Sequence, residues 1–389
     1  MKRCYLNSMA MLSALGDSPA QVCERLISGQ PELTFTDQFS SSEVLPLGLY
    51  GGTLPEISFS DTKWQSRNNR FALAALQQIR SDIDAAVKRY GADRVGVVIG
   101  TSTSGIGDSE AFLSHRAQTG QLSDEYDYGL QEMGATAAFV AKQLNVNGPI
   151  FAISTACSSG SKALASARRL VRSGLCDAVI AGGVDTLCHL TVQGFSSLEA
   201  VSNQPCNPFS VNRNGINIGE AAALFLVTTE AQGVELVGVG ESSDAHHISA
   251  PDPSGGGAVR CMSAALADAG IAAEQISYIN LHGTATALND QMEALAVAAV
   301  FGSSAQCSST KPFTGHTLGA AGALEAAICW LALQEGFTPV HHWDGVYDPE
   351  LPPINLVTET NTTEIPEYML SNSFAFGGNN ISLILRGLR

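Results

Sequence analysis

Short apolar segments alternate along this chain with longer segments in which apolar residues recur at the spacing of a helix. In the first half, three segments rich in β-forming residues are predicted as buried strands: Arg94–Gly100, Pro149–Thr155 and Asp177–Gly183. Between the last two, apolar residues recur at helical spacing and a glycine follows them: Ala163, Leu164, Ala167, Leu170, Val171 and Gly174. The pattern therefore predicts a strand, a helix and a second strand in succession.

The second half has the same alternation. It predicts a strand, a helix, a strand running into a turn, and two strands joined at a glycine turn: Val234–Glu241, Ala258–Ala269, Ile276–Thr286 and Leu370–Arg386. A further helix is expected to start near Asp290. Both halves therefore have the order of an α/β protein. We place a boundary near Val234, giving halves 1–233 and 234–389 that share one packed body.

Composition and charge narrow the classes of protein to which the chain can belong. Of 389 residues, 45% are hydrophobic and 15% charged, and 38 are glycine, which is typical of a compact globular protein. The 37 acidic residues outnumber the 21 basic ones, so nucleic acid is excluded as an expected partner. No segment resembles a membrane span or an export signal. The nine cysteines contain no Cys-x-x-Cys pair, and we expect reduced thiols in the cytoplasm.

One cysteine occupies a position suited to chemistry. Cys157 lies in "STACSSG", between the predicted strand that ends near Thr155 and the predicted helix that follows. A sulfur at the amino end of a helix is favoured as a thiolate, which is the nucleophilic form. The small neighbours leave room for an incoming group. Taken alone, however, a single cysteine of this kind is more often a buried structural thiol.

Two histidines and one candidate ion pair lie in the second half of the chain. His282 ends an apolar strand in "NLHGTAT", and α/β folds commonly place their reactive residues at the ends of strands. A structural histidine would give the same pattern. His316 is expected at the start of a helix that is apolar on nearly all sides and must be buried. Glu325 is the only acid in that helix, and burying its charge is costly unless a cation pairs with it. Lys311 is the nearest candidate for that cation. The alternative is a surface lysine and a glutamate that faces a solvent channel.

A glycine pair near the carboxyl end completes the set of candidate segments. Gly377 and Gly378 in "NSFAFGGNN" permit a tight turn and a close approach of backbone to a ligand. An ordinary hairpin would have the same pattern.

Four segments together resemble one family. The chain carries "TACSSG", "HGTAT", "SSTKPFTGHTLGAAGALE" and "NSFAFGGNN" in this order. It resembles the β-ketoacyl-[acyl carrier protein] synthases, in the class I/II elongating branch of the condensing enzymes of the thiolase superfamily. Starter-type synthases carry Cys-His-Asn, whereas this chain has the Cys-His-His set. The resemblance implies a thiolase-type five-layer α-β-α-β-α fold made of two similar halves, and a dimer joined edge to edge.

The reaction that the resemblance implies is a decarboxylative Claisen condensation. Cys157 would accept an acyl group from a carrier-protein thioester, and its backbone N–H and that of Phe376 would bind the oxyanion. His282 and His316 would polarise the thioester of malonyl-[acyl carrier protein], so that the 3-oxoacyl chain grows by two carbons. Phe376 would also gate the acyl tunnel.

Supporting roles follow from the same resemblance. Lys311 and Glu325 would orient the two histidines. Thr284 and Thr286 would hold the pantetheine arm, and Phe374 would bind substrate.

The tunnel and the docking surface are further expectations. Ile106 in "TSTSGIG" would limit the acyl tunnel, with ordinary core packing as the alternative. Lys63, Arg67 and Arg70 form a basic cluster in an acidic protein and would steer an acidic carrier protein, with a solvated helix face as the alternative. No metal and no cofactor is expected beyond the phosphopantetheine arm of the acyl carrier protein.

Departures from the family pattern leave the pathway and the partner open. Asn289 stands where the family has glycine, and Asn379 where it has threonine. Fatty acid synthesis and a specialised polyketide or polyene pathway both fit, as do a homodimer and a heterodimer with a Cys-less homologue. A tunnel-shaping subunit of such a heterodimer and a thiolase or simple acyltransferase are the competing functions. The length and saturation of the acyl group stay undetermined.

Overall fold

The computed structural model describes residues 2–40, 43–360 and 366–388. Eleven strands form one mixed sheet in the order β11-β10-β9-β12-β13-β8-β1-β7-β6-β4-β5. Five of them come from the first half of the chain: β1 (Tyr5–Leu12), β4 (Val95–Gly100), β5 (Ile150–Ile153), β6 (Ala178–Asp185) and β7 (Ala221–Thr228). The other six come from the second half: β8 (Val234–Ser243), β9 (Ile276–Asn280), β10 (Gln306–Ser308), β11 (Asn355–Leu356), β12 (Tyr368–Ala375) and β13 (Asn379–Gly387).

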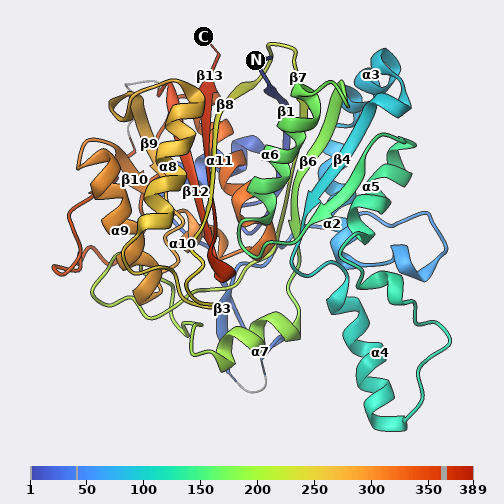
Figure 1. Ribbon diagram of the computed structural model, residues 1–389. Helices are drawn as coiled ribbons and strands as arrows, with labels where there is room; N and C mark the ends of the chain where they lie inside the picture. Colours follow the sequence, from blue (N-terminus) through green and yellow to red (C-terminus); the bar gives the residue numbers. More distant parts are fainter. Residues whose placement is uncertain (1, 41–42, 361–365, 389) are drawn as a thin grey trace.

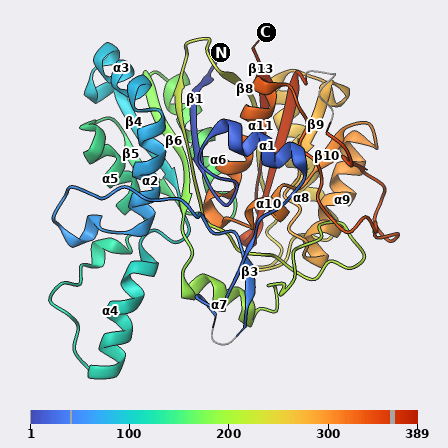
Figure 2. The same cartoon turned by 180° about the vertical axis from the view of Figure 1, so that it is seen from behind.

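The two sets of strands are joined by a single narrow contact. β1 pairs with β8 through only two residue pairs, Tyr5 with Glu235 and Leu6 with Val234. By contrast, β1 pairs with β7 over most of its length, and β13 pairs with β8 from end to end. The strands are therefore best described as two sheets, one from each half, that meet at β1 and β8 (Figures 1 and 2).

Helices cover both sheets and fill the space between them. The central layer consists of α6 (Ser159–Arg172) and α11 (Ala321–Glu335). The outer layer over the first sheet consists of α2 (Arg67–Gln78), α3 (Arg80–Tyr90) and α5 (Ala135–Leu144). The outer layer over the second sheet consists of α8 (Gly256–Ala269) and α9 (Ala287–Phe301). The order is therefore α-β-α-β-α, as the resemblance predicted (Figure 1).

Alternation along the strands explains why five layers form. In β6, Ala178 and Ile180 belong to the core under the outer helices, whereas Val179 and Ala181 belong to the core around α6 and α11. Because successive side chains of a strand point to opposite faces, an all-apolar strand needs a helical layer on each side. α11 lies between the two sheets and contacts strands of both. Because its own residues are buried on all sides of the helix, it has no solvent-facing stripe.

The remaining elements lie around this body. They are α1 (Pro19–Ser28), α4 (Ile106–Thr119), α7 (His189–Ser197), the short α10 (Lys311–Thr314), and a small hairpin of β2 (Thr34–Thr36) and β3 (Leu45–Leu47). Figure 1 shows α4 standing away from the five layers and α7 lying below the central helices. In the part of the chain that the structure describes, no helix has both the length and the apolar character to cross a membrane.

The predicted strands and helices are present, with one difference in burial. The segment around β5 was expected to be a buried strand, but Ile150 and Phe151 are 40% and 38% exposed. The reason is that β5 is the last strand of its sheet and has only β4 as a neighbour. The sequence shows that a strand is apolar, but it does not show whether the strand has a neighbouring strand on one side or on both.

Candidate active site

Cys157 lies in a tight turn between β5 and α6. Ala156, just before it, has a left-handed backbone with φ 51°, which is uncommon for a residue other than glycine. Ser159 holds the turn, because its hydroxyl donates to Ala156 O at 2.6 Å and accepts from Thr155 N at 2.9 Å. The turn places Cys157 two residues before α6, as the sequence predicted, with the side chain buried at the floor of a cavity.

His316 is in direct contact with this cysteine. Its Nε2 lies 3.0 Å from Cys157 Sγ. The backbone around His316 is held by two hydrogen bonds to a neighbouring segment: His316 N donates to Asn217 O at 2.6 Å, and His316 O accepts from Gly219 N at 3.0 Å. The expectation that His316 starts a helix is wrong, since α11 begins at Ala321 and Leu318 between them has a left-handed φ of 52°. A separately fixed loop therefore positions the imidazole.

His282 follows β9 and faces the same cavity. The rings of His282 and His316 have centroids 5.4 Å apart and stand nearly perpendicular. Glu293 of α9 fixes the backbone, because its carboxylate accepts from His282 N at 2.8 Å and Gly283 N at 2.7 Å. Lys311 Nζ lies 3.4 Å from His282 Nδ1. Because an ammonium can only donate, this contact assigns the ring hydrogen to Nε2, the nitrogen that is free to face the cavity.

The predicted pairing of Lys311 with Glu325 is observed. Lys311 Nζ lies 2.5 Å from Glu325 Oε1, and the two side chains are only 2% and 4% exposed. Lys311 also donates to the carbonyl oxygen of His282. Burial raises the pKa of Glu325 to about 6, while the charge of Lys311 lowers it. Glu325 therefore holds the ammonium of Lys311 directly behind His282.

Burial decides the protonation states of the three reactive groups. It raises the pKa of Cys157 to about 11, although the charge of Lys311 and hydrogen bonds from the backbone N–H groups of Phe376 and Cys157 lower it. Burial and the charge of Lys311 hold the pKa of both His282 and His316 well below the usual histidine value. The thiolate expected from the helix end is therefore not the resting form, since burial outweighs it. A neutral thiol faces two neutral imidazoles.

This arrangement predicts how the reactivity of Cys157 depends on pH. A thiol with a pKa near 11 should be alkylated by iodoacetamide about tenfold faster for each unit of pH between 7 and 10, without a plateau. The modification of the Cys157 peptide, followed by mass spectrometry, measures this rate. A short unstructured peptide with one cysteine, blocked at both ends, serves as the control, because its rate should level off above a pKa of about 8.5. A plateau for Cys157 below pH 8 would show a resting thiolate and contradict the prediction.

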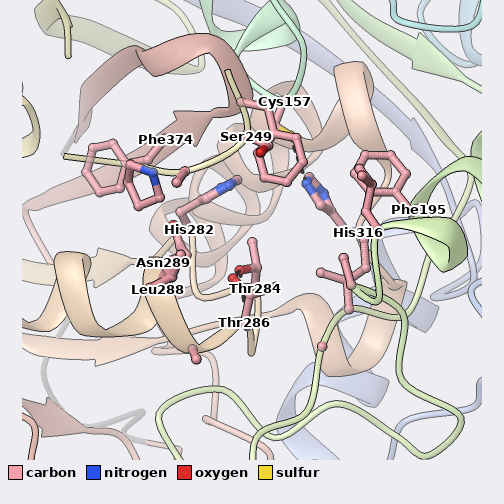
Figure 3. Close-up of a pocket in the computed structure, with 18 of the residues that line it drawn as sticks. Cys157, Phe195, Ser249, His282, Thr284, Thr286, Leu288, Asn289, His316 and Phe374 are labelled. Carbon is pink, nitrogen blue, oxygen red and sulfur yellow. Dashed lines mark hydrogen bonds between the residues drawn. The ribbon is translucent and has the colours of Figure 1, made fainter. Parts of the chain in front are cut away.

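A cavity of about 490 Å³ opens above the three groups. Thr284, Thr286, Phe374 and Phe376 line it together with Cys157 and both histidines. Figure 3 shows His282 and His316 turned toward Cys157, with the two threonines beyond them. The threonine hydroxyls lie 2.9 Å apart and offer hydrogen bonds along one wall.

The backbone after Phe376 closes another side of the cavity. Gly377 and Gly378 have left-handed φ values of 79° and 73°, which is why this turn needs glycine. Gly377 N donates to Ile248 O at 2.7 Å, and Asp244 N donates to Gly378 O at 3.0 Å, so a second loop holds the turn. The ring of Phe376 contacts that of Phe195, with centroids 5.7 Å apart.

The structure does not bring every predicted residue to this site. Ile106 is half-buried at the start of α4 and does not line the cavity. Arg67 binds the buried carboxylate of Glu220 through two hydrogen bonds of 2.5 and 3.0 Å. The role of Ile106 in limiting an acyl tunnel stays a prediction, and so does the role of Arg67 in docking a carrier protein.

The other two cations of the predicted docking cluster are also engaged within the chain. Arg70 pairs with Glu56 at 3.0 Å and donates to the carbonyls of Leu54 and Pro55. The ammonium of Lys63 lies over the ring of Trp64. The cluster is therefore less available than its sequence suggests, because these contacts already satisfy much of its charge.

Sequence reasoning missed Glu293, which positions His282. The signal was weaker than for Glu325, because α9 also carries Asn289, Asp290 and Gln291 in its first turns, so Glu293 did not stand out as a lone acid. Burial raises the pKa of Glu293 to about 7, while the two backbone N–H groups that it accepts lower it.

The three reactive groups also have the composition of a metal site. The ligating atoms of Cys157, His282 and His316 lie within 4.8 Å of one another. A histidine that binds a metal usually donates its second nitrogen hydrogen to an acceptor. Here the second nitrogen of His282 faces the ammonium of Lys311, which would also repel a divalent cation. The donor set therefore favours nucleophilic chemistry over metal binding.

Comparisons with known proteins agree over almost the whole chain. Family models described as the N-terminal and C-terminal domains of beta-ketoacyl synthase match residues 7–232 and 234–342. The 3-oxoacyl-[acyl-carrier-protein] synthase 2 of Staphylococcus aureus (strain COL) is 31% identical over 99% of this chain and 98% of its own length.

Solved structures agree as well. A chain of the complex between the ketosynthase ApeO and its chain length factor ApeC from Xenorhabdus doucetiae is 45% identical with a TM-score of 0.95, over 100% of this chain and 98% of that chain. A beta-ketoacyl synthase from Burkholderia phymatum is 28% identical with a TM-score of 0.90, over the whole of both chains.

Proposed function

The chain belongs to the β-ketoacyl synthase family of condensing acyltransferases, and from this premise we propose that it joins an acyl group on Cys157 to malonyl-[acyl carrier protein]. The observation that carries the proposal is the distance of 3.0 Å between Cys157 Sγ and His316 Nε2, with His282 facing the same cavity. A nucleophile beside a base, with a second ring across the cavity, suits a two-stage transfer.

In the first stage, the thiol of Cys157 attacks the thioester of an acyl carrier protein. His316 Nε2 takes the thiol proton as the carbon–sulfur bond forms, and gives it to the departing pantetheine thiolate. The low pKa of His316 suits this role, since a neutral imidazole can accept a proton. The oxyanion of the tetrahedral intermediate would lie against the backbone N–H groups of Cys157 and Phe376, which lower the pKa of the Cys157 thiol.

In the second stage, the malonyl thioester loses carbon dioxide. His282 Nε2–H would donate a hydrogen bond to the thioester oxygen, and so would His316 once its ring hydrogen has moved to Nε2, so that the electron pair of the broken carbon–carbon bond is held as an enolate. The enolate carbon attacks the acyl carbonyl on Cys157, the cysteine sulfur leaves as a thiolate, and one proton taken up from solvent restores the thiol. Neither step requires a metal or a redox cofactor. Thr284 and Thr286 offer hydroxyls to the amides of the pantetheine arm.

We further propose that the chain works as the catalytic half of a heterodimer with a homologue that lacks the nucleophile. The support is the likeness to the complex that the ketosynthase ApeO forms with its chain length factor ApeC. Cys157, His282 and His316 are all present in this chain, which favours the catalytic role over that of the tunnel-shaping partner. A homodimer, as in the housekeeping synthases, is the alternative.

His282→Ala separates the two stages and tests the proposed function. The variant should lose malonyl decarboxylation by about 10²-fold or more, because it removes one donor to the forming enolate, and should keep most of its self-acylation. Intact mass spectrometry of the protein with acyl and malonyl carrier proteins, alone and with a co-purified Cys-less homologue, measures both stages.

His115→Ala is the control for this test, since His115 is exposed on α4 and lies outside the cavity. Absence of any acyl adduct on the unaltered protein, in either assembly, would reject the proposed function. Retained decarboxylation in His282→Ala would reject the role of His282.

A further inference from the structure

A buried carboxylate outside the catalytic set connects two loops of the site. Asp185 is the last residue of β6 and has no exposed surface. Its Oδ1 accepts from Thr101 Oγ1 at 2.5 Å, Ser102 N at 2.9 Å, and Thr103 N and Oγ1 at 3.0 and 2.9 Å. Its Oδ2 accepts from Ser102 N at 2.9 Å and from Gly319 N at 2.6 Å. All of these donors are neutral groups.

The first of the two loops lies between β4 and α4. It spans residues 101–105 and leads directly to Ile106, the residue expected to limit the acyl tunnel. Ser104 in this loop has a left-handed φ of 47°, and its backbone N–H donates to Thr101 Oγ1 at 2.9 Å. The loop therefore depends on contacts that stabilise an unfavourable backbone conformation.

The second loop follows His316. Gly319 lies three residues after that histidine, and Leu318 beside it also has a left-handed backbone. A β-carbon on Gly319 would lie 2.7 Å from Asp185 Oδ2 and 2.7 Å from Ser102 N, so the two loops touch at this glycine. Gly160 of α6, the helix that follows Cys157, packs against the carbonyl of Gly319.

Only a carboxylate can make this set of contacts. Each of its two oxygens accepts hydrogen bonds, whereas an asparagine of the same shape has one acceptor and one donor. A side chain that meets N–H groups on both of its sides must be an acceptor on both. Burial raises the pKa of Asp185, while the donors of Thr101, Thr103 and Ser102 lower it, consistent with contacts that favour the ionised form.

We propose that Asp185 is a positioning residue that fixes the loop leading to Ile106 and the loop carrying His316 relative to each other. The position of the acyl chain and that of the decarboxylating histidine are then set by one side chain. This inference rests on the proposed function. It adds a residue that touches neither substrate nor the reacting atoms.

Asp185→Asn tests the connection, because it changes the donor pattern and not the shape. Oδ1 serves four donors, so the amide oxygen should stay on the side of residues 101–103 and the amide NH₂ should face Gly319 N. The displaced loop should move His316. We expect malonyl decarboxylation to fall about tenfold or more, and self-acylation of Cys157 to fall as well, because His316 acts in both stages, while circular dichroism should show the variant as fully folded as the unaltered protein.

Thr101→Val tests the other side of the same carboxylate. It removes one donor to Oδ1 and leaves the contact with Gly319 intact. Its decarboxylation rate should stay within about threefold, whereas its preference among carriers with short, medium and long acyl chains should change. Self-acylation with carriers of each length, followed by intact mass, measures the preference.

Asp177→Asn is the matched control. Asp177 lies just before the same strand, at its opposite end, and forms a half-exposed ion pair with Arg94. This variant should leave both rates unchanged. The proposal is overturned if Asp185→Asn decarboxylates within about twofold of the unaltered protein, or if circular dichroism shows that a loss of folded protein accounts for the lower rates. If the unaltered protein itself does not decarboxylate, it is the proposed function that fails.

Discussion

Cys157→Ala is expected to abolish condensation, with a loss of at least about 10³-fold, because no other thiol is among the described residues that line the cavity. His282 and His316 remain, so decarboxylation of malonyl carrier protein should persist in the same variant. The product of condensation and the acyl adduct on the protein, both measured by mass spectrometry, report the loss. Release of carbon dioxide reports the part that is retained.

Cys23→Ala provides the matched control for this variant. Cys23 is a half-buried thiol on α1, outside the cavity, so its removal should change neither stage. Condensation that continues in Cys157→Ala would mean that another residue holds the acyl group. In that case the assignment of the nucleophile, and with it the two-stage mechanism, would be wrong.

Lys311→Met is expected to lower the free energy of unfolding by about 3 kcal/mol at pH 8, because it leaves the carboxylate of Glu325 buried without its partner. The charge of Lys311 lowers the pKa of Glu325, so its removal should raise that pKa above its present value of about 6. A buried carboxyl with a raised pKa contributes stability that is lost as pH increases through that pKa. The loss in Lys311→Met should therefore be larger at pH 8 than at pH 5.5.

Chemical denaturation at the two pH values measures this difference. The double variant Lys311→Met with Glu325→Leu is the control, since it removes both charges and should recover most of the stability without recovering activity. Arg80→Met is a second control, because Arg80 pairs with Asp84 on the exposed surface of α3 and should contribute less than about 1 kcal/mol. A loss below about 1 kcal/mol for Lys311→Met at pH 8 would contradict the argument.

Much of the fold followed from the sequence because the strands are short, apolar and bounded by clear turns. The pairing of Lys311 with Glu325 also followed, since a lone acid in an apolar helix needs a nearby cation. The start of the helix after His316 did not follow. Its apolar pattern runs without a break through Leu318, and nothing in that pattern reveals a left-handed backbone there.

Other features depended on contacts between distant parts of the chain. The basic character of Arg67 was visible, but its partner Glu220 is separated from it by 153 residues. The thiolate expected for Cys157 followed from its place at a helix end, whereas its burial depends on residues from both halves that surround the cavity. Asp185 acts on two loops that are 84 and 134 residues away from it in the sequence, so its role could be inferred only once the loops were placed.

The position of β1 has a consequence for how the protein is made. This strand is synthesised long before its neighbours in the sheet, β7 and β8, which lie beyond residue 220. β8 in turn pairs with β13, the last strand of the chain. Pairing between strands so distant in sequence slows folding, and an unpaired apolar edge is prone to aggregation. The nascent chain therefore leaves the ribosome with its central strand unpaired. The yield of folded protein in a cell depends on how long that strand stays without its neighbours.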